Sequence, residues 1–240
     1  MSHTAIVTGG TRGIGAAISI SLSEAGHHVA ATYAGNDEAA QAFKAETGIS
    51  VYKFDVADFD QCAKSVAQIE TDLGQVGILV NNAGITRDGT LHRMDFEQWN
   101  AVLQTDLSSC YNMCRNVIEG MRERGFGRIV NIGSVNGQAG QYGQVNYAAA
   151  KSGIHGFTKA LALEGAAKGI TVNAIAPGYV DTDMVRAVPE KVLEKIIATI
   201  PVGRLGYASD IARTVMFLVA DDATFVTGST LSINGGQHMY

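Results

Sequence analysis

Three side chains in the second half of the chain have the types and spacing that acid–base chemistry requires. Tyr147 and Lys151 are four residues apart, and on a helix this spacing places two side chains on one face. A free phenol has a pKa of about 10, but a nearby ammonium favours the phenolate and makes the phenol a usable acid and base. Ser134, 13 residues before Tyr147, offers a hydroxyl that can hydrogen bond to a substrate oxygen as negative charge develops.

A glycine-rich segment near the N-terminus, residues 8–15 (TGGTRGIG), has the composition of a phosphate-binding turn. Glycines let the backbone turn sharply and approach a pyrophosphate, and a helix N-terminus adds amide donors and the positive end of a dipole. A structural turn without a ligand is the alternative. The position of the segment, between an apolar run and an amphipathic one at 13–26, favours dinucleotide binding.

Short apolar runs alternate with longer amphipathic segments, and they predict the elements that position these residues. The runs predict strands at about 5–8, 29–33, 51–54, 78–80, 128–132, 171–176 and 231–233. Intervening helices imply right-handed βαβ units, and strands that are apolar throughout imply a sheet covered on both faces. We therefore expect an α/β protein of the Rossmann type, a doubly wound parallel sheet of about seven strands, with Ser134 at its carboxyl edge.

The length of 240 residues suits one domain of this kind, so we expect a single dinucleotide-binding catalytic domain over residues 1–240. Residues 185–205 depart from the strand–helix alternation, because they are amphipathic and carry several basic residues. The segment follows Pro177 and contains Pro201. We expect it to form a helical flap over the site.

Composition argues against other classes of protein. Hydrophobic residues make up 46% of the chain, which argues against disorder despite 28 glycines, and a net charge of -5 gives nucleic-acid binding no support. No apolar stretch reaches the roughly 18–20 residues of a membrane span, and the first residues lack the features of a signal peptide. We expect a cytoplasmic protein with neither nucleic-acid nor membrane partners.

The three cysteines do not form a disulfide framework, because their number is odd and no CxxC pair is present. Cys110 and Cys114 could place two zinc ligands on one helix face, but no nearby histidine completes a site. We expect buried thiols, Cys62 included, and no metal site.

Five motifs in order resemble the short-chain dehydrogenase/reductase family over essentially the whole chain. They are T-G-x-x-x-G-x-G at 8–15, N-N-A-G at 81–84, Ser134, Y-x-x-x-K at 147–151 and Pro-Gly at 177–178. The resemblance implies that a nicotinamide hydride reaches a carbonyl carbon while Tyr147 donates a proton to the oxygen. It also implies that Ser134 orients and polarises the carbonyl, and that Lys151 holds the nicotinamide ribose and tunes Tyr147.

The residues that would meet the cofactor favour NADPH. An acid ending the second strand would bond the ribose of NAD and repel the 2′-phosphate of NADP, but Tyr33 stands there and the next acid is Asp37. Arg12 stands in the glycine loop, where NADP-dependent family members often carry a basic residue, and a guanidinium binds phosphate through two hydrogen bonds. A solvated surface charge is the alternative for Arg12. The expected cofactor-binding residues are Gly9, Thr11, Arg12, Gly13, Ile14, Gly15, Tyr33, Asp55, Val56, Asn82, Ala83, Gly84, Tyr147, Lys151, Pro177, Gly178 and Val180.

One position departs from the family pattern. The helix after the fourth strand usually carries an Asn, in a T-N-L setting, that anchors a proton-relay water, and this chain reads Thr105-Asp106-Leu107. An ionised Asp accepts hydrogen bonds but cannot donate them. We expect Asp106 to serve in the relay, with a raised pKa in a crowded site.

Two branches of the family compete for the substrate, the 3-oxoacyl-ACP reductases of fatty-acid synthesis and the acetoacetyl-CoA reductases of polyhydroxybutyrate synthesis. Segments 134–147, 155–158 and 234–239 resemble the second branch. That resemblance implies an (R)-3-hydroxybutanoyl-CoA product. The implied substrate-binding residues are Asp88, Ser134, Gln141, Tyr142, Gln144, Tyr147 and Tyr179. A merely polar surface is the alternative for the Gln-rich loop.

A dinucleotide-binding sensor without catalysis is the alternative of a different class, although binding alone would not require Ser134, Tyr147 and Lys151 together. The resemblance further implies a homotetramer, built through the long helices around 99–121 and 146–168. Both segments are apolar and rich in small residues.

Overall fold

The computed structural model describes residues 2–186 and 188–239, and its strands form a seven-stranded parallel sheet in the order β3-β2-β1-β4-β5-β6-β7. The expected doubly wound sheet is confirmed, with strand ends within two residues of those predicted from the apolar runs. The strands are β1 (Thr4–Val7), β2 (His28–Tyr33), β3 (Ser50–Lys53), β4 (Val76–Asn81), β5 (Gly127–Ile132), β6 (Ile170–Pro177) and β7 (Thr230–Ile233).

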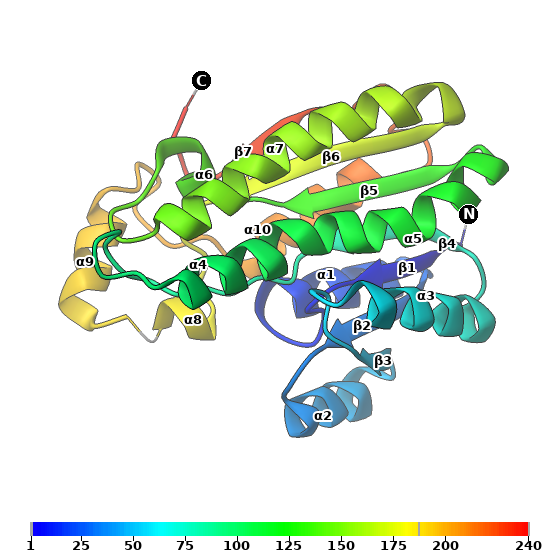
Figure 1. Ribbon diagram of the computed structural model, residues 1–240, viewed down its shortest axis with the longest axis horizontal. Coiled ribbons are helices and arrows are strands. Elements are labelled where there is room, and N and C mark those ends of the chain that lie inside the picture. The colour runs from blue at the N-terminus through cyan, green and yellow to red at the C-terminus, as the bar shows by residue number, and fades with distance from the viewer. Residues whose placement is uncertain (1, 187, 240) are drawn as a thin grey trace.

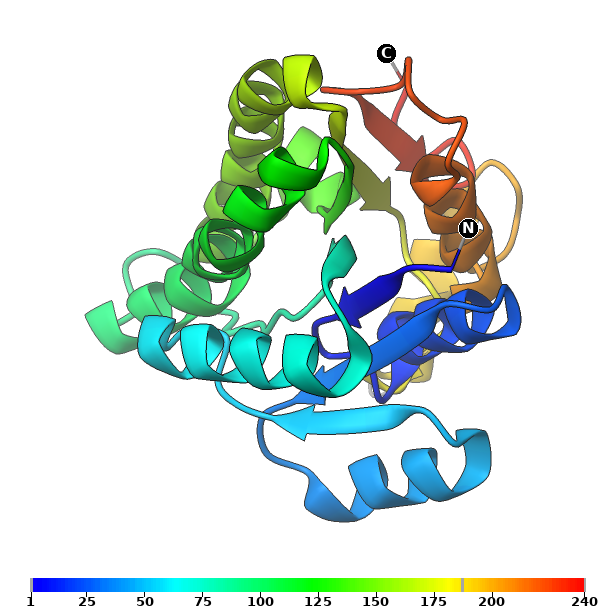
Figure 2. The same cartoon turned by 90° about the vertical axis from the view of Figure 1, so that its right-hand side faces the viewer.

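Helices cover both faces of the sheet, as Figure 2 shows, with one apolar core on each side. On one face, α1 (Gly13–Glu24) and α10 (Ala208–Val219) bury Leu22 and Val215 against the strands. On the other, α3 (Phe59–Leu73), α5 (Ser109–Arg124) and α7 (Val145–Gly165) bury Ile69 and Met113. The remaining helices are α2 (Asp37–Thr47), α4 (Phe96–Leu103), α6 (Val135–Ala139), α8 (Asp183–Arg186) and α9 (Glu190–Ala198), with a π-helical turn η1 (Gln104–Ser108) and a 3₁₀ turn η2 (Ala166–Lys168).

The strand order reverses at β1, which pairs with β2 on one side and with β4 on the other. In a sheet of this type ligands bind at the carboxyl edge beside such a reversal. The glycine-rich loop follows β1 and the Asn-rich loop follows β4, so both reach that edge. In Figure 1, α8 and α9 lie on the side toward which the arrowhead of β5 points.

The expected flap at 185–205 contains the end of α8 and the whole of α9, while Ala187 lies outside the described residues. A β-bridge between Val180 and Gly206 closes its base. The long segment at 99–121 is not one regular α-helix, because η1 separates α4 from α5. Within the described residues, no helix is both long and apolar enough to cross a membrane.

Candidate active site

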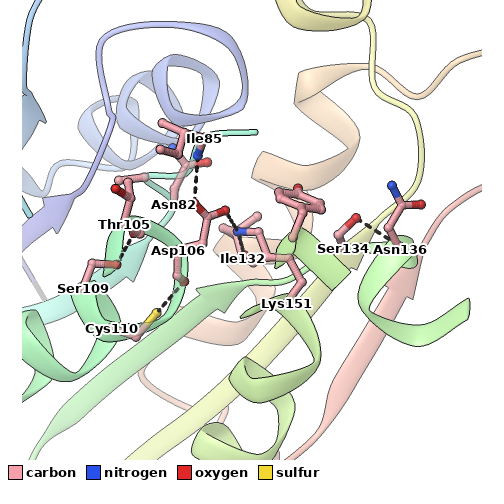
Figure 3. Close-up of polar contacts among 12 residues, drawn as sticks. Asn82, Ile85, Thr105, Asp106, Ser109, Cys110, Ile132, Ser134, Asn136 and Lys151 are labelled. Carbon is pink, nitrogen blue, oxygen red and sulfur yellow. Dashed lines mark hydrogen bonds and ion pairs between the residues drawn. The ribbon is translucent and has the colours of Figure 1, made fainter. Parts of the chain in front are cut away.

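The centre of the site is the buried ammonium of Lys151 on α7 (Figure 3). Its Nζ donates a hydrogen bond to the carbonyl oxygen of Ile132, at 3.0 Å, and lies 3.4 Å from Oδ2 of Asp106. Both side chains are almost fully buried, at 4% and 0% exposure. The second carboxylate oxygen, Oδ1, accepts the backbone N–H of Ile85 at 2.9 Å. A charged lysine is therefore held between a strand end and a carboxylate.

The pKa values of this pair follow from burial and from their mutual attraction. Burial raises the pKa of Asp106, and the neighbouring Lys151 offsets only part of that rise. Burial alone would lower the pKa of Lys151, but the carboxylate of Asp106, together with Tyr147 and Cys110, outweighs it and raises that pKa. The raised pKa expected for Asp106 is confirmed, and the pair keeps Lys151 in its ammonium form.

Asp106 reaches Lys151 from an irregular stretch of helix. It lies in η1, where the N–H of Ser109 bonds to the carbonyl of Gln104 in the five-residue spacing of a π-helix. Such turns are rare and occur frequently at functional sites. The sequence pattern predicted a helix here but not this turn, because five-residue spacing leaves no hydrophobic signature in so short a segment.

Gly84 leaves the space that the ion pair occupies. A Cβ atom at this residue would lie 2.8 Å from Oδ2 of Asp106 and 3.3 Å from Nζ of Lys151. Both atoms are buried, so neither can move into solvent. Gly84 of the N-N-A-G motif, expected among the cofactor-binding residues, thus also makes room for the carboxylate and the ammonium.

Tyr147 is half-buried at the start of α7, and Nζ of Lys151 lies 5.5 Å from the centre of its ring. Its backbone N–H donates to Oδ1 of the fully buried Asn146, at 2.8 Å. The side-chain amide of Asn146 in turn donates to the carbonyls of Arg87 and Gln98, at 3.0 and 3.2 Å. The first turn of α7 is therefore fixed to the segment that follows β4.

Ser134 is the N-cap of α6, just beyond the end of β5, and its side chain is largely buried. Its Oγ accepts the backbone N–H of Asn136 at 3.1 Å. A hydroxyl that accepts one hydrogen bond still has its own proton to donate. The local geometry of α6 thus leaves Ser134 able to donate to a substrate oxygen.

The expected substrate-binding residues divide into two groups. Gln144 donates through Nε2 to both carboxylate oxygens of Asp88, at 3.1 and 3.0 Å, and the half-buried Tyr179 interacts with Asn136. Burial raises the pKa of the Tyr179 phenol, and the charges of Asp88 and Tyr147 act in the same direction. Gln141 and Tyr142 are exposed, the latter at 87%, and within the described residues their side chains make no hydrogen bond to the rest of the site. Apart from Ser134 and Tyr147, five substrate-binding residues were expected, and the structure brings three of them together, Asp88, Gln144 and Tyr179.

The glycine loop fits a dinucleotide phosphate. Gly9 and Gly13 have φ angles of +62° and +53°, a region that favours glycine, and a Cβ atom on Gly15 would collide with the carbonyl oxygen of Gly9. The first turn of α1 has neither a side-chain cap nor an acidic residue. Its free amide groups and dipole are therefore available to an anion.

The loop is fastened to the Asn-rich segment across the sheet reversal. Oγ1 of Thr8 accepts the backbone N–H groups of Asn82 and Ala83, both at 2.9 Å, and Nδ2 of Asn82 donates to the carbonyl of Thr8 at 2.9 Å. The two cofactor motifs recognised in the sequence therefore share one hydrogen-bonded edge.

The other expected cofactor residues lie at or just after the ends of three strands along the carboxyl edge of the sheet. Tyr33 ends β2, Asp55 and Val56 follow β3, and Pro177 ends β6, with Gly178 and Val180 beyond it. Arg12 is exposed and forms no ion pair with any described residue, whereas the first acid after β2, Asp37, is paired with Lys53 at 2.7 Å.

The sequence pattern did not indicate two residues that organise the site, Asn136 and Asn146, and it gave Thr8 only as the first residue of the glycine motif. The signal for Asn146 is a polar residue immediately before Tyr147 at a helix start, but its bonding partners could not be inferred from spacing. Cys62, Cys110 and Cys114 are buried, as expected, and burial raises the pKa of Cys110 to about 11. Among the described residues no cluster of three or more acidic, His or Cys side chains could hold a metal ion.

Comparison with known proteins places the chain among reductases. A family model described as enoyl-(acyl carrier protein) reductase matches residues 9–238. The acetoacetyl-CoA reductase of Shinella zoogloeoides is 64% identical over 238 residues, and that of Rhizobium meliloti is 64% identical over 239, with 99% of each chain covered in both cases. The 3-oxoacyl-[acyl-carrier-protein] reductase of Haemophilus influenzae is 46% identical over 237 residues, which cover 98% of both chains.

The role of Gly84 is tested by Gly84→Ala, with Gly89→Ala as a matched control. A methyl group at Gly84 meets two buried charged atoms, whereas one at Gly89 meets nothing within 4 Å. We expect Gly84→Ala to lower the free energy of unfolding by about 1–3 kcal/mol, as overpacking does, and Gly89→Ala to leave it nearly unchanged. Urea unfolding measures both, and equal stabilities of the two variants would contradict the tight packing.

Proposed function

The chain belongs to the short-chain dehydrogenase/reductase family, and we propose that it reduces acetoacetyl-CoA to (R)-3-hydroxybutanoyl-CoA with NADPH, as one catalytic domain over residues 1–240. The observation that carries the reductase chemistry is the buried Lys151, held by Ile132 and Asp106 beside Tyr147. The relatives at 64% identity, named acetoacetyl-CoA reductases, support the substrate. We extend the proposal to polyhydroxybutyrate synthesis, which the resemblance implies.

The catalytic roles depend on which hydroxyl protons are available for donation to the substrate. Ser134 accepts from the Asn136 N–H, so its own O–H can donate to the substrate carbonyl oxygen and stabilise charge there. Tyr147 supplies the proton to the same oxygen. A bound NADPH supplies the hydride that reduces the carbonyl carbon.

Lys151 serves both the cofactor and the tyrosine. Its ammonium has three N–H groups, of which one is donated to Ile132 and another faces Asp106. The third remains for a ribose hydroxyl, as the family resemblance implies. Its positive charge, maintained by Asp106, attracts the negative charge that proton donation leaves on the Tyr147 oxygen.

Asp106 is proposed as a member of the proton relay. Its Oδ2 is buried and makes no hydrogen bond within the described residues, although it pairs with Lys151. A carboxylate oxygen with spare acceptor capacity next to an ammonium can accept a proton or hold a water molecule. The substitution of Asp for the usual Asn thus adds an acceptor to the relay.

The cofactor pocket is proposed to hold NADPH through the glycine loop, the Asn-rich segment and the residues after β2, β3 and β6. Arg12 is the candidate for the 2′-phosphate, because it is exposed and has no acidic partner among the described residues. Asp37 forms an ion pair with Lys53, and this pairing reduces the repulsion between the Asp37 carboxylate and a phosphate.

Asp88, Gln144 and Tyr179 are proposed to border the acyl and pantetheine parts of the substrate, with Gln141 and Tyr142 at the outer rim.

We also propose a cytoplasmic homotetramer. The exposed apolar residues Tyr111 on α5 and Leu163 on α7 support it. A monomeric mass by light scattering would exclude it. A 3-oxoacyl-ACP reductase is the second candidate, supported by relatives at 46% identity. A non-catalytic dinucleotide sensor is the candidate of another class.

The direct test of the substrate is NADPH oxidation with acetoacetyl-CoA and, separately, with the acetoacetyl thioester of acyl carrier protein. We expect turnover with both and a higher kcat/KM for the CoA thioester. A strong preference for the carrier protein would favour the second candidate, and no turnover with either would favour a sensor.

Tyr147→Phe is the control for catalysis in that assay, because it removes only the hydroxyl. Losing a general acid costs about 10²–10⁴ in rate, so we expect kcat to fall at least by about 100-fold. The Kd of NADPH, measured by fluorescence, should change little. Substantial residual turnover in this variant would contradict the role of Tyr147.

Arg12→Ala tests the cofactor assignment. A hydrogen bond to a charged group contributes about 1.5–3 kcal/mol, so the ratio of kcat/KM for NADPH to that for NADH should fall by about tenfold or more. Arg115→Ala, which removes an exposed arginine of α5, is the control and should leave the ratio unchanged. An unaltered ratio in the Arg12 variant would exclude its role in selecting the phosphate.

A further inference from the structure

A chain of side-chain hydrogen bonds links three loops around Ser134. Nδ2 of Asn136 on α6 donates to Oε1 of Gln144 at 2.9 Å, and Nε2 of Gln144 donates to the carboxylate of Asp88. The chain crosses from the segment after β5 to the N-cap of α7, and from there to the segment after β4. Asn136 is its first member, and the proposed reaction uses only its backbone N–H and not its side chain.

Asp88 sets the donor-to-acceptor direction of this series of hydrogen bonds. An ionised carboxylate only accepts, so Gln144 must present its NH₂ group to Asp88 and its carbonyl oxygen to Asn136. That oxygen also only accepts, so Asn136 must present its own NH₂ group. A carboxylate at position 136 could not do this, although it has the same shape.

The chain joins the two helices that carry the catalytic groups. Gln144 caps α7, and its carbonyl accepts the N–H of Ala148, one residue beyond Tyr147. Two turns further along α7, Gly137 of α6 packs so closely that a Cβ atom would lie 2.7 Å from the carbonyl carbon of Lys151. The hydroxyl of Ser152 also donates to the carbonyl of Gly137. The short helix α6 is therefore fastened along the stretch of α7 that bears Tyr147 and Lys151.

We propose that Asn136 is a positioning residue, whose side-chain amide fixes the direction of the Asn136–Gln144–Asp88 chain and thereby the placement of Ser134 relative to Tyr147. Its backbone N–H leaves the Ser134 proton free to donate, and its side chain fastens α6 to the cap of α7. The kinetic part of this inference rests on the proposed reductase function. The hydrogen-bond chain itself does not.

The test is a double-mutant cycle in which the polarity of the chain is reversed. Asn136→Asp places a carboxylate against Oε1 of Gln144, which is also an acceptor. If the side-chain amide of Gln144 rotates by half a turn, its carbonyl oxygen faces the carboxylate of Asp88 instead, so the conflict only moves. Asp88→Asn resolves this conflict, because the turned Gln144 can donate to the new carboxylate at position 136 while the new amide at position 88 donates to its carbonyl. The four proteins of the cycle are compared by kcat with acetoacetyl-CoA, by Tm and by the Kd of NADPH.

We expect Asn136→Asp to lower kcat by about tenfold or more when Asp88 is present, and by less than about threefold in the Asp88→Asn background. Tm should show the same coupling, and the Kd of NADPH should stay within about twofold throughout. Gln138→Glu is the matched control, since it makes the same amide-to-carboxylate change on α6. Its partner, the hydroxyl of Ser232, can still donate to a carboxylate, so neither kcat nor Tm should change much.

Equal losses of kcat in both backgrounds would overturn the proposal, and so would coupling in Tm without coupling in kcat, because the chain would then be structural only. If Asn136→Asp does not fold, Asn136→Ala decides, since it removes the donor without adding a charge. Its kcat should fall about three- to tenfold with the Kd of NADPH unchanged, and full activity would refute the positioning role. Absence of turnover in the wild type would refute the reductase function, while Tm would still report on the chain.

Discussion

A positive charge buried at the carboxyl edge of the sheet constrains the rest of the site. An ammonium taken out of water is costly unless paired, and Lys151 is paired by the carbonyl of Ile132 and the carboxylate of Asp106. The neighbouring backbone accommodates this pair. The π-helical turn carries Asp106, and Gly84 leaves room for its oxygen. The positive charge of Lys151, which the reaction needs, is thus maintained by the same contacts that make its burial possible.

The loops around this charge are held to one another by hydrogen bonds across the carboxyl edge of the sheet. Thr8 and Asn82 fasten the glycine loop to the end of β4, and Asn146 fastens the start of α7 to the segment beyond it. Each bond crosses between segments more than 45 residues apart in the chain. A parallel sheet brings such ends together at one edge, so short polar side chains are sufficient to connect them.

Much of the fold and the principal site residues could be predicted from the sequence. The strands are apolar throughout and lie between amphipathic helices, so the sheet and its two covered faces followed from local patterns. Ser134, Tyr147 and Lys151 were proposed because their chemistry depends on fixed spacing. Asn136 and the π-helical turn at Asp106 were not found, because their importance depends on partners that only the folded chain brings near. Local spacing likewise could not show that Gln141 and Tyr142 are exposed.

The central claim is that Asp106 maintains the charge of Lys151, and the pH dependence of kcat for Asp106→Asn tests it most directly. The carboxylate raises the pKa of Lys151 against the effect of burial, so its removal lowers that pKa, and the ammonium is lost at lower pH. The basic limb of the profile should therefore move to lower pH than in the wild type. Asp95→Asn, which removes an exposed carboxylate but keeps a good helix cap, should leave the limb in place. A basic limb that stays unchanged in Asp106→Asn, or moves to higher pH, would contradict the account.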